Sequence, residues 1–218
     1  MSTPRDLILF DIDGTLLRTE GAGRASLDAA FLRLCGWNGA MDGIDLAGAT
    51  DGWILQQVRH RWGAFPEERL QALYLEELSG RIAGRASALP GVHRAVAALG
   101  ERAHVGLLTG NWREGARIKL TAIDLWWEGP SAFGDDAVDR NHLVPVARRR
   151  AQEWGYQPRR VVVIGDTPKD VECARAGDAI AVAVKTGFAT VESLEQSHPD
   201  LLLADLESGL DALLELLG

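Results

Sequence analysis

The chain has 218 residues and a formal net charge of -8, because 31 aspartates and glutamates outnumber 23 lysines and arginines. Hydrophobic residues make up 46% of it and charged residues 25%, which is typical of one globular domain, or of one that carries a smaller insertion. This composition excludes disordered, collagen-like and disulfide-rich classes. The acidic balance argues against nucleic acid or an anionic membrane as partner, since both need a concentrated cationic face.

The sequence contains neither a recognisable signal peptide nor an apolar run long enough to span a membrane. Residues 7–10 are too few for the hydrophobic region of a signal peptide, and Asp11 and Asp13 follow almost at once. No apolar run reaches the roughly 18 residues of a membrane span. Cys35 and Cys173 stand without a CxxC or Cys/His spacing, so neither a disulfide framework nor a zinc site is expected. We therefore expect a cytoplasmic protein that binds a small molecule.

Short apolar runs with strand character recur along the chain with helical patterns between them. Their residues are continuously apolar, as in the run VVVIG, which is typical of parallel strands covered by helices on both faces. The pattern predicts an α/β fold built on a doubly wound, Rossmann-like parallel sheet. The expected strands are 7–10, 104–109, 161–165 and 180–184, with further short ones at 201–203 and near Ala132, and a closing helix at 206–217.

An insertion separates the first expected strand from the second. The intervening residues 11–103 are several times as many as one crossover helix requires. Within them, apolar residues recur at helical spacing in three stretches, the last opened by Pro66. We therefore expect an α/β core domain formed by residues 1–15 and 90–218, and an all-helical cap domain formed by residues 16–89.

Polar residues follow three of the expected strands. Asp11 and Asp13 come after the first, Thr109 after the second, and Asp166 and Asp170 after the VVVIG run. Reactive groups in open α/β sheets lie beyond the carboxyl ends of the strands, so these side chains should meet. Crowded carboxylates repel one another unless a divalent cation neutralises them. Oxygen ligands without His or Cys favour Mg²⁺, which also binds substrate phosphate.

In these residues the chain resembles the haloacid dehalogenase-like (HAD) hydrolase superfamily, in particular its phosphatase branch with a helical cap, of which phosphoglycolate phosphatases are familiar members. The first motif is Asp-Ile-Asp-Gly-Thr at 11–15, the second Thr-Gly-Asn at 109–111, and the fourth Gly-Asp-Thr-Pro-Lys-Asp at 165–170. Each follows its expected strand in the expected order, and the resemblance covers nearly the whole chain. A single motif is unspecific, but the set is not.

The resemblance implies roles for the acidic residues. Asp11 would be the nucleophile that attacks phosphorus, and Asp13 the general acid that protonates the leaving oxygen and later the base that activates water. Metal ligands would be the Asp11 carboxylate, the Asp13 backbone carbonyl and Asp166. Asp170 would hold a metal-bound water or orient Asp166.

The resemblance also implies a phosphate-binding set. Thr109 would donate its hydroxyl to a phosphoryl oxygen, and backbone N–H groups at Gly110 and Asn111 would add to it. The third motif of the family is a cation, usually Lys, before the helix that leads into the VVVIG strand, and here the sequence departs. Arg140 stands at the expected position and is the candidate we favour, while Lys119, on the helix after Thr109, competes with it.

Substrate choice should lie in the cap. The Gly-rich segment 43–51 is its expected contact, where Thr50 and Asp51 reach the leaving group; alternatively, either residue is only the N-cap of the helix that starts at Gly52. The expected function is Mg²⁺-dependent hydrolysis of a small phosphorylated metabolite, similar to phosphoglycolate, through an aspartyl-phosphate. A sugar phosphomutase or haloacid dehalogenase of the same superfamily, or a non-catalytic binding protein, are the alternatives.

Overall fold

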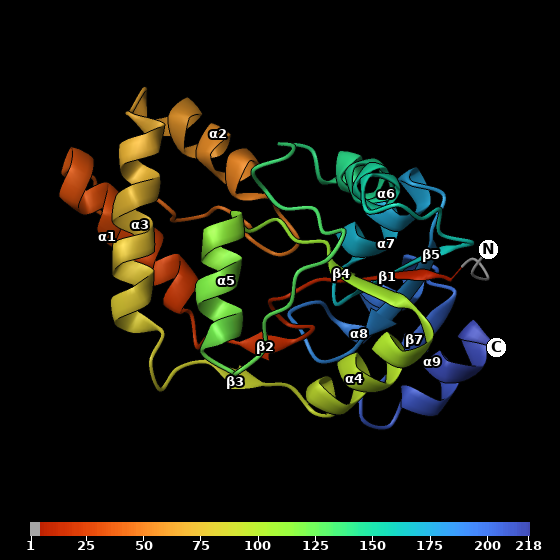
Figure 1. Cartoon of the computed structure of the whole chain (residues 1–218). Helices are drawn as coiled ribbons and strands as arrows, with labels where there is room; N and C mark the ends of the chain where they lie inside the picture. The colour runs from red at the N-terminus through yellow and green to blue at the C-terminus, as the bar shows by residue number, and fades with distance from the viewer. Residues whose placement is uncertain (1–4) are drawn as a thin grey trace.

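The computed structural model describes residues 5–218 and confirms the expected α/β class (Figure 1). Strand β1 (Leu7–Phe10) lies at the interior of a five-stranded sheet, between β4 (His104–Leu107) and β5 (Val161–Gly165). Beyond β5 follow β6 (Ile180–Val184) and β7 (Leu201–Leu203), so that the strand order is β4-β1-β5-β6-β7. Every pairing in this sheet is parallel.

Helices cover both faces of the sheet, as continuously apolar strands require. Helices α6 (Leu143–Glu153) and α7 (Pro168–Ala176) pack on one face, and α4 (Val92–Arg102) and α9 (Leu210–Leu217) on the other (Figure 1). Helix α8 (Val191–Gln196) connects β6 to β7.

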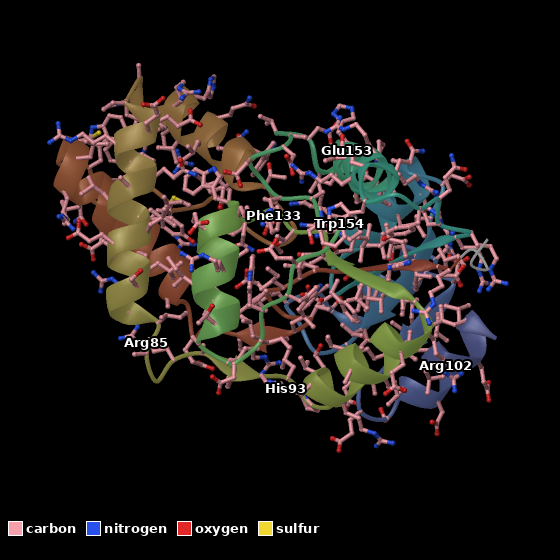
Figure 2. All side chains as sticks on the ribbon, viewed as in Figure 1. Arg85, His93, Arg102, Phe133, Glu153 and Trp154 are labelled. Atoms are coloured by element: carbon pink, nitrogen blue, oxygen red, sulfur yellow. The ribbon has the colours of Figure 1, made fainter. Side chains whose placement is uncertain are left out.

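Successive side chains of β1 point into different cores, because residues in a strand alternate between the two faces. Ile8 and Phe10 belong to the core under α4 and α9, and Leu7 and Leu9 to the core under α6 and α7. Phe133, labelled in Figure 2, completes the first of these cores. All four residues of β1 are buried, so the strand gives Asp11, which follows it, a rigid support.

The insertion between β1 and β4 is helical. It holds α1 (Ala22–Cys35), α2 (Asp51–Trp62) and α3 (Glu67–Arg81), which share a third apolar core. The chain enters this unit through β2 (Leu17–Arg18) and leaves it through β3 (Ser87–Ala88), and the two strands pair antiparallel. We propose that this pair marks the boundary between the core domain (1–15 and 90–218) and the cap domain (16–89).

Local sequence signals set the ends of the cap helices. Helix α1 ends at Gly36, which adopts a left-handed conformation with φ 72°, the usual place for a glycine after a helix. Thr50 caps α2 by accepting a hydrogen bond from the backbone N–H of Trp53 at 3.1 Å. No helix among residues 5–218 is long and apolar enough to cross a membrane.

Two expectations about the secondary structure are wrong, one about the start of a helix and one about a short strand. Helix α9 begins later than position 206, because the carboxylate of Asp205 accepts from the backbone N–H of Ser208 and holds a turn there. Ala132 forms one isolated parallel bridge with Leu108 rather than a strand.

Candidate active site

The carboxyl ends of the sheet strands bring the motif residues together. Phe10 at the end of β1 is in register with Leu107 of β4 and Ile164 of β5. Asp11 therefore leaves the sheet at the same level as the residues that follow β4 and β5. Its backbone N–H still donates to Ile164 at 2.9 Å, which continues the ladder up to the site.

Three carboxylates converge at this edge. Asp11, Asp166 and Asp170 are buried, and each offers one oxygen within 4.8 Å of those of the other two. Burial, reinforced by the Asp170 carboxylate, raises the pKa of Asp11 to about 7 in spite of the nearby Arg140. Burial and the charges of Asp170 and Asp11 raise the pKa of Asp166 to about 8. The cluster therefore favours uptake of positive charge.

The donor set fits a divalent metal ion. Three carboxylate oxygens without His or Cys match a hard cation such as Mg²⁺. Gly14 and Gly187 lie so close to the Asp166 carboxylate that a Cβ at either position would collide with it, so both positions require glycine. The N–H of Phe188 donates to Asp166 Oδ2 at 3.0 Å and orients it.

Asp170 is held by the start of its own helix. Thr167 caps α7, and its hydroxyl and backbone N–H donate to Asp170 Oδ2 at 2.6 and 2.9 Å. This capping box uses one oxygen of Asp170. The other oxygen, Oδ1, accepts from Arg140, so that Asp170 orients the guanidinium.

Arg140 bridges two of the carboxylates. It begins the short 3-10 helix η1 (Arg140–His142), is only 7% exposed, and donates from Nη2 to Asp11 Oδ1 at 2.9 Å as well as to Asp170. Burial disfavours its charge, but the Asp170 and Asp11 carboxylates hold the pKa of Arg140 above its ordinary value. Its Nη1 also reaches the carbonyl of Gly48 in the cap at 3.4 Å.

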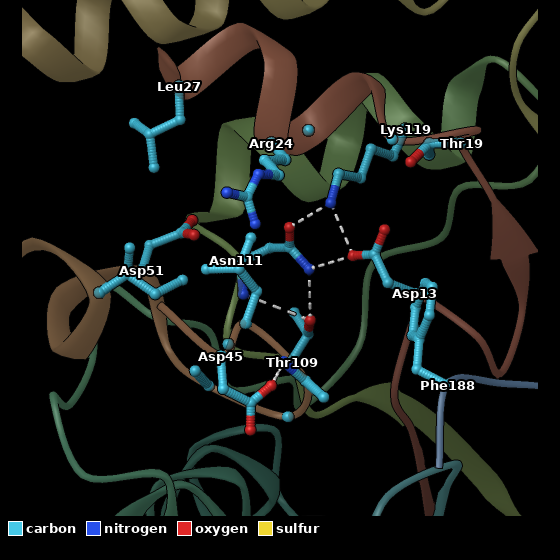
Figure 3. Close-up of a pocket in the computed structure, with 18 of the residues that line it drawn as sticks. Asp13, Thr19, Arg24, Leu27, Asp45, Asp51, Thr109, Asn111, Lys119 and Phe188 are labelled. Carbon is cyan, nitrogen blue, oxygen red and sulfur yellow. Dashed lines mark hydrogen bonds and ion pairs between the residues drawn. The ribbon is translucent and has the colours of Figure 1, made fainter. Parts of the chain in front are cut away.

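Lys119 serves a different carboxylate. From α5 (Arg113–Thr121), its Nζ donates to Asp13 Oδ2 and to Asn111 Oδ1, both at 2.6 Å (Figure 3). Asn111 Nδ2 in turn donates to Asp13 Oδ2 and to Thr109 Oγ1, both at 2.8 Å. From the sequence, Arg140 and Lys119 are competitors for one position. The structure places both at the site, Arg140 on Asp11 and Lys119 on Asp13.

The hydroxyl group of Thr109 is free to donate a hydrogen bond. The residue is fully buried, and its oxygen accepts from the side chain of Asn111 and from the backbone N–H of Asn111. Because both contacts use the oxygen as acceptor, the hydroxyl proton is left to donate elsewhere. Gly110 is packed against the cap, where a Cβ would collide with the carbonyl of Ala49.

The cap residues differ in position. Thr50 is not brought to the site: its hydroxyl donates to the carbonyl of Val138 and accepts from Trp53, so both roles are used and it is the N-cap of α2. Asp51 is not the cap of that helix. Its Oδ2 accepts from the backbone N–H of Trp112 at 2.7 Å, and burial raises its pKa to about 6.

A cavity of about 710 Å³ lies between the core edge and the cap helices. Its lining includes the motif residues Asp11, Asp13, Thr109, Lys119 and Arg140 together with Asp51. Tyr74 and Phe188 are among the lining residues that the sequence did not indicate. Tyr74 belongs to the apolar repeat of α3, and no spacing separates it from the other core positions.

Comparison with known proteins identifies the family. A family model described as haloacid dehalogenase-like hydrolase matches residues 5–178. The chain belongs to the HAD-like hydrolase family. Phosphoglycolate phosphatase from Synechococcus elongatus is 31% identical over 219 residues, which cover 96% of this chain and 98% of the relative. Phosphoglycolate phosphatase from Mesorhizobium japonicum is 25% identical over 223 residues, covering 94% and 92%.

The fold agrees with that of a solved hydrolase structure. A hydrolase from Pseudomonas syringae superposes with a TM-score of 0.73 at 23% identity, over 99% of this chain and 100% of the other. The family match and the phosphatase relatives indicate that this HAD protein is a phosphatase. HAD hydrolases generally use a divalent metal, and the buried Asp11, Asp166 and Asp170 cluster is suited to hold one.

Proposed function

We propose that this HAD protein is a Mg²⁺-dependent phosphatase that hydrolyses a small phosphate monoester, similar to phosphoglycolate, through an aspartyl-phosphate intermediate. The observation that carries the proposal is the position of Asp11. It lies at the end of the interior strand β1, with Arg140 2.9 Å from one of its oxygens, on the lining of a cavity that also holds Asp13. A carboxylate so placed can attack a phosphoryl group bound in the cavity.

In the first step, an oxygen of Asp11 forms a bond to phosphorus while the ester P–O bond breaks. Arg140 holds Oδ1, which leaves Oδ2 as the attacking atom. Asp13 in its protonated form gives a proton to the leaving oxygen, so that a neutral alcohol departs. Lys119 and Asn111 both contact Asp13 Oδ2 and fix that carboxyl group.

In the second step, water replaces the enzyme oxygen on phosphorus. Asp13, now a carboxylate, takes a proton from the water, which attacks the phosphoryl group and breaks its bond to Asp11. The products are inorganic phosphate and free Asp11. Lys119 stabilises the charge that Asp13 carries between the two steps, because its ammonium lies 2.6 Å away.

The transferred phosphoryl group is bound by groups from two strands. Thr109 donates its free hydroxyl proton, and the backbone N–H of Gly110 adds a further donor, whereas the N–H of Asn111 donates to Thr109 Oγ1. Arg140 supplies positive charge beside the attacking oxygen. Hydrolysis of phosphate monoesters is among the slowest uncatalysed reactions, so this charge stabilisation has to supply much of the rate.

Asp11, the backbone carbonyl of Asp13, Asp166 and Asp170 are the residues we assign to Mg²⁺. When bound, the ion would neutralise the carboxylate cluster and stabilise negative charge on the phosphoryl oxygens. Two properties of this chain support the assignment, namely the crowding of the carboxylates and the raised pKa values of Asp11 and Asp166.

The substrate class follows from the cavity and the relatives. A volume of about 710 Å³ suits a small phosphorylated metabolite. The relatives named phosphoglycolate phosphatase support a two-carbon acid as the leaving group. Neither a nucleic acid nor a membrane surface is required.

Phosphate release from a panel of small esters, measured with Mg²⁺ and with EDTA, tests the proposal. Phosphoglycolate, sugar phosphates and nucleotides should be included. We expect metal-dependent release confined to one or two esters. Isomerisation of a sugar phosphate without release would instead identify a mutase, and release that persists in EDTA would contradict the metal assignment.

A further inference from the structure

Tyr74 contributes a hydroxyl to the cavity. The residue lies in the middle of α3, is 3% exposed, and is part of the cavity lining. Within residues 5–218 the hydroxyl has no hydrogen-bond partner, and it is not among the fully buried polar atoms that lack one, so it is open to the cavity. A hydroxyl that opens into a cavity normally forms its hydrogen bond with whatever fills that cavity. A ligand in the cavity would supply that partner.

The ring of Tyr74 is held in a fixed position. It meets Trp112 edge-on, with 5.4 Å between ring centroids. The ring also packs against Gly115 of α5, where a Cβ would be 3.3 Å from Cε1 and 3.5 Å from the hydroxyl oxygen of Tyr74. Glycine at this position therefore lets the ring lie directly on α5, and the packing orients the hydroxyl without hydrogen bonds.

The Tyr74 ring packs on the same face of α5 that carries Lys119, and both residues line the cavity. Gly115 and Lys119 are one helical turn apart and share a face of α5. Of the three N–H bonds of Lys119, two are used by Asp13 and Asn111, which leaves one donor. The cap covers this ammonium closely, since a Cβ at Gly23 of α1 would lie 3.4 Å from Nζ. A phenol donor and an ammonium donor thus line one part of the cavity, beside the proposed general acid Asp13.

The hydroxyl acts as a donor. Burial, with the negative charges of Asp51 and Asp13, holds the pKa of Tyr74 well above its usual range, so that the phenol keeps its proton at any physiological pH. With its proton retained, the hydroxyl can donate to an oxygen of a bound ligand. Asp13 marks where the ester oxygen departs, so the accepting oxygen belongs to the leaving group.

We infer that Tyr74 is a specificity-determining residue of the leaving-group side of the cavity, where its hydroxyl donates a hydrogen bond to an oxygen on the leaving group of the substrate. The inference rests on the proposed phosphatase function and deepens it. The accepting oxygen is a carboxylate or a hydroxyl oxygen on the carbon beyond the ester. The unused donor of Lys119 makes the carboxylate the better acceptor.

Tyr74→Phe tests the inference with three esters of similar size. Phosphoglycolate carries a carboxylate on its second carbon, 2-hydroxyethyl phosphate a hydroxyl, and ethyl phosphate neither. For Tyr74→Phe we expect kcat/KM to fall roughly 10- to 100-fold with phosphoglycolate, the size expected for a lost hydrogen bond to a charged group. The loss should be smaller with 2-hydroxyethyl phosphate and absent with ethyl phosphate, which also reports that the fold and the phosphoryl chemistry are intact.

Tyr156→Phe is the matched control, because Tyr156 is the other of the two tyrosines in the chain and stacks on His104, outside the cavity lining. It should leave all three kcat/KM values unchanged. An equal loss with all three esters in Tyr74→Phe, or no loss with any, would overturn the inference alone. Failure of the wild-type protein to hydrolyse any of the three would overturn the proposed function and the inference together.

Discussion

Lys119 Nζ lies 2.6 Å from Asp13 Oδ2, although 106 positions separate the two residues in the chain. Asn111 touches both, accepting from the ammonium and donating to the carboxylate. The ammonium is almost fully buried, whereas the Asp13 side chain is 28% exposed and faces the cavity. The proposed general acid is therefore oriented from behind by a cation and an amide, and its other oxygen, Oδ1, is left for the substrate.

We expect Lys119→Met to lower kcat about 10- to 100-fold, because Asp13 loses a charged partner while the length of the side chain is kept. Steady-state rates with the best ester of the panel provide the measurement. Lys185→Met is the control, since Lys185 is exposed and does not line the cavity. An unchanged kcat in Lys119→Met would show that Asp13 needs no partner.

Asp11→Asn should lower kcat by at least about 10⁴-fold, because the amide cannot form the covalent intermediate. The fold should be retained. At pH 8 without metal, the melting temperature should even rise, since one of three buried, like-charged groups is removed. Asp211→Asn, an exposed aspartate on α9, should change neither quantity. Residual activity close to wild type would exclude Asp11 as nucleophile.

The metal-free protein should lose stability as pH rises. The folded-state pKa values of about 7 for Asp11 and about 8 for Asp166 lie above the roughly 3.9 of an unfolded Asp. Between these values the folded state binds more protons than the unfolded state, so the free energy of unfolding falls as pH rises from about 4 to about 8. Urea unfolding in EDTA at pH 5 and pH 8 measures this change.

Mg²⁺ should reverse that loss. Adding the ion at pH 8 should raise the urea midpoint more than at pH 5, because at the lower pH protons compete for the same carboxylates. In Asp166→Asn, both the pH slope and the Mg²⁺ effect should shrink. A midpoint that does not respond to Mg²⁺ at either pH would contradict the assignment of the acidic cluster as a metal site.

Arg140→Met should be the most destabilising of these changes. It leaves the buried carboxylates of Asp11 and Asp170 without their counter-charge, which costs about 3 kcal/mol in the free energy of unfolding at pH 8. Arg140→Lys keeps a positive charge and should recover part of both stability and kcat. Equal unfolding free energies for wild type and Arg140→Met would mean that the ion pairs contribute nothing.

The sheet strands could be predicted because each is a continuous apolar run, and the motif carboxylates could be placed because they follow those runs directly. Asp11 and Asp166 follow neighbouring strands that are in register, so identifying the individual strands was sufficient to predict that the two carboxylates meet. The partners of the two cations could not be predicted. Arg140 follows a long irregular connection after α5, and Lys119 lies two helical turns beyond Asn111, so neither spacing indicates which carboxylate each would meet.

The cap contacts were harder to predict, because they depend on how two separately packed units meet. Thr50 and Asp51 are adjacent, yet Thr50 turns inward to cap α2 and Asp51 receives the N–H of Trp112 from the core. Tyr74 has the spacing of a core residue, and it does pack as one. Its role at the cavity depends on its contact with Gly115 of α5, and the sequence of α3 alone gives no indication of that contact.

The antiparallel pair of Leu17 and Ala88 places the two ends of the cap segment side by side. A segment whose ends adjoin can be lengthened, shortened or exchanged without rerouting the chain that enters and leaves it. The strands that carry Asp11, Thr109 and Asp166 all lie outside that segment. Substrate preference can therefore diverge among descendants of one ancestor while the phosphoryl chemistry is inherited unaltered.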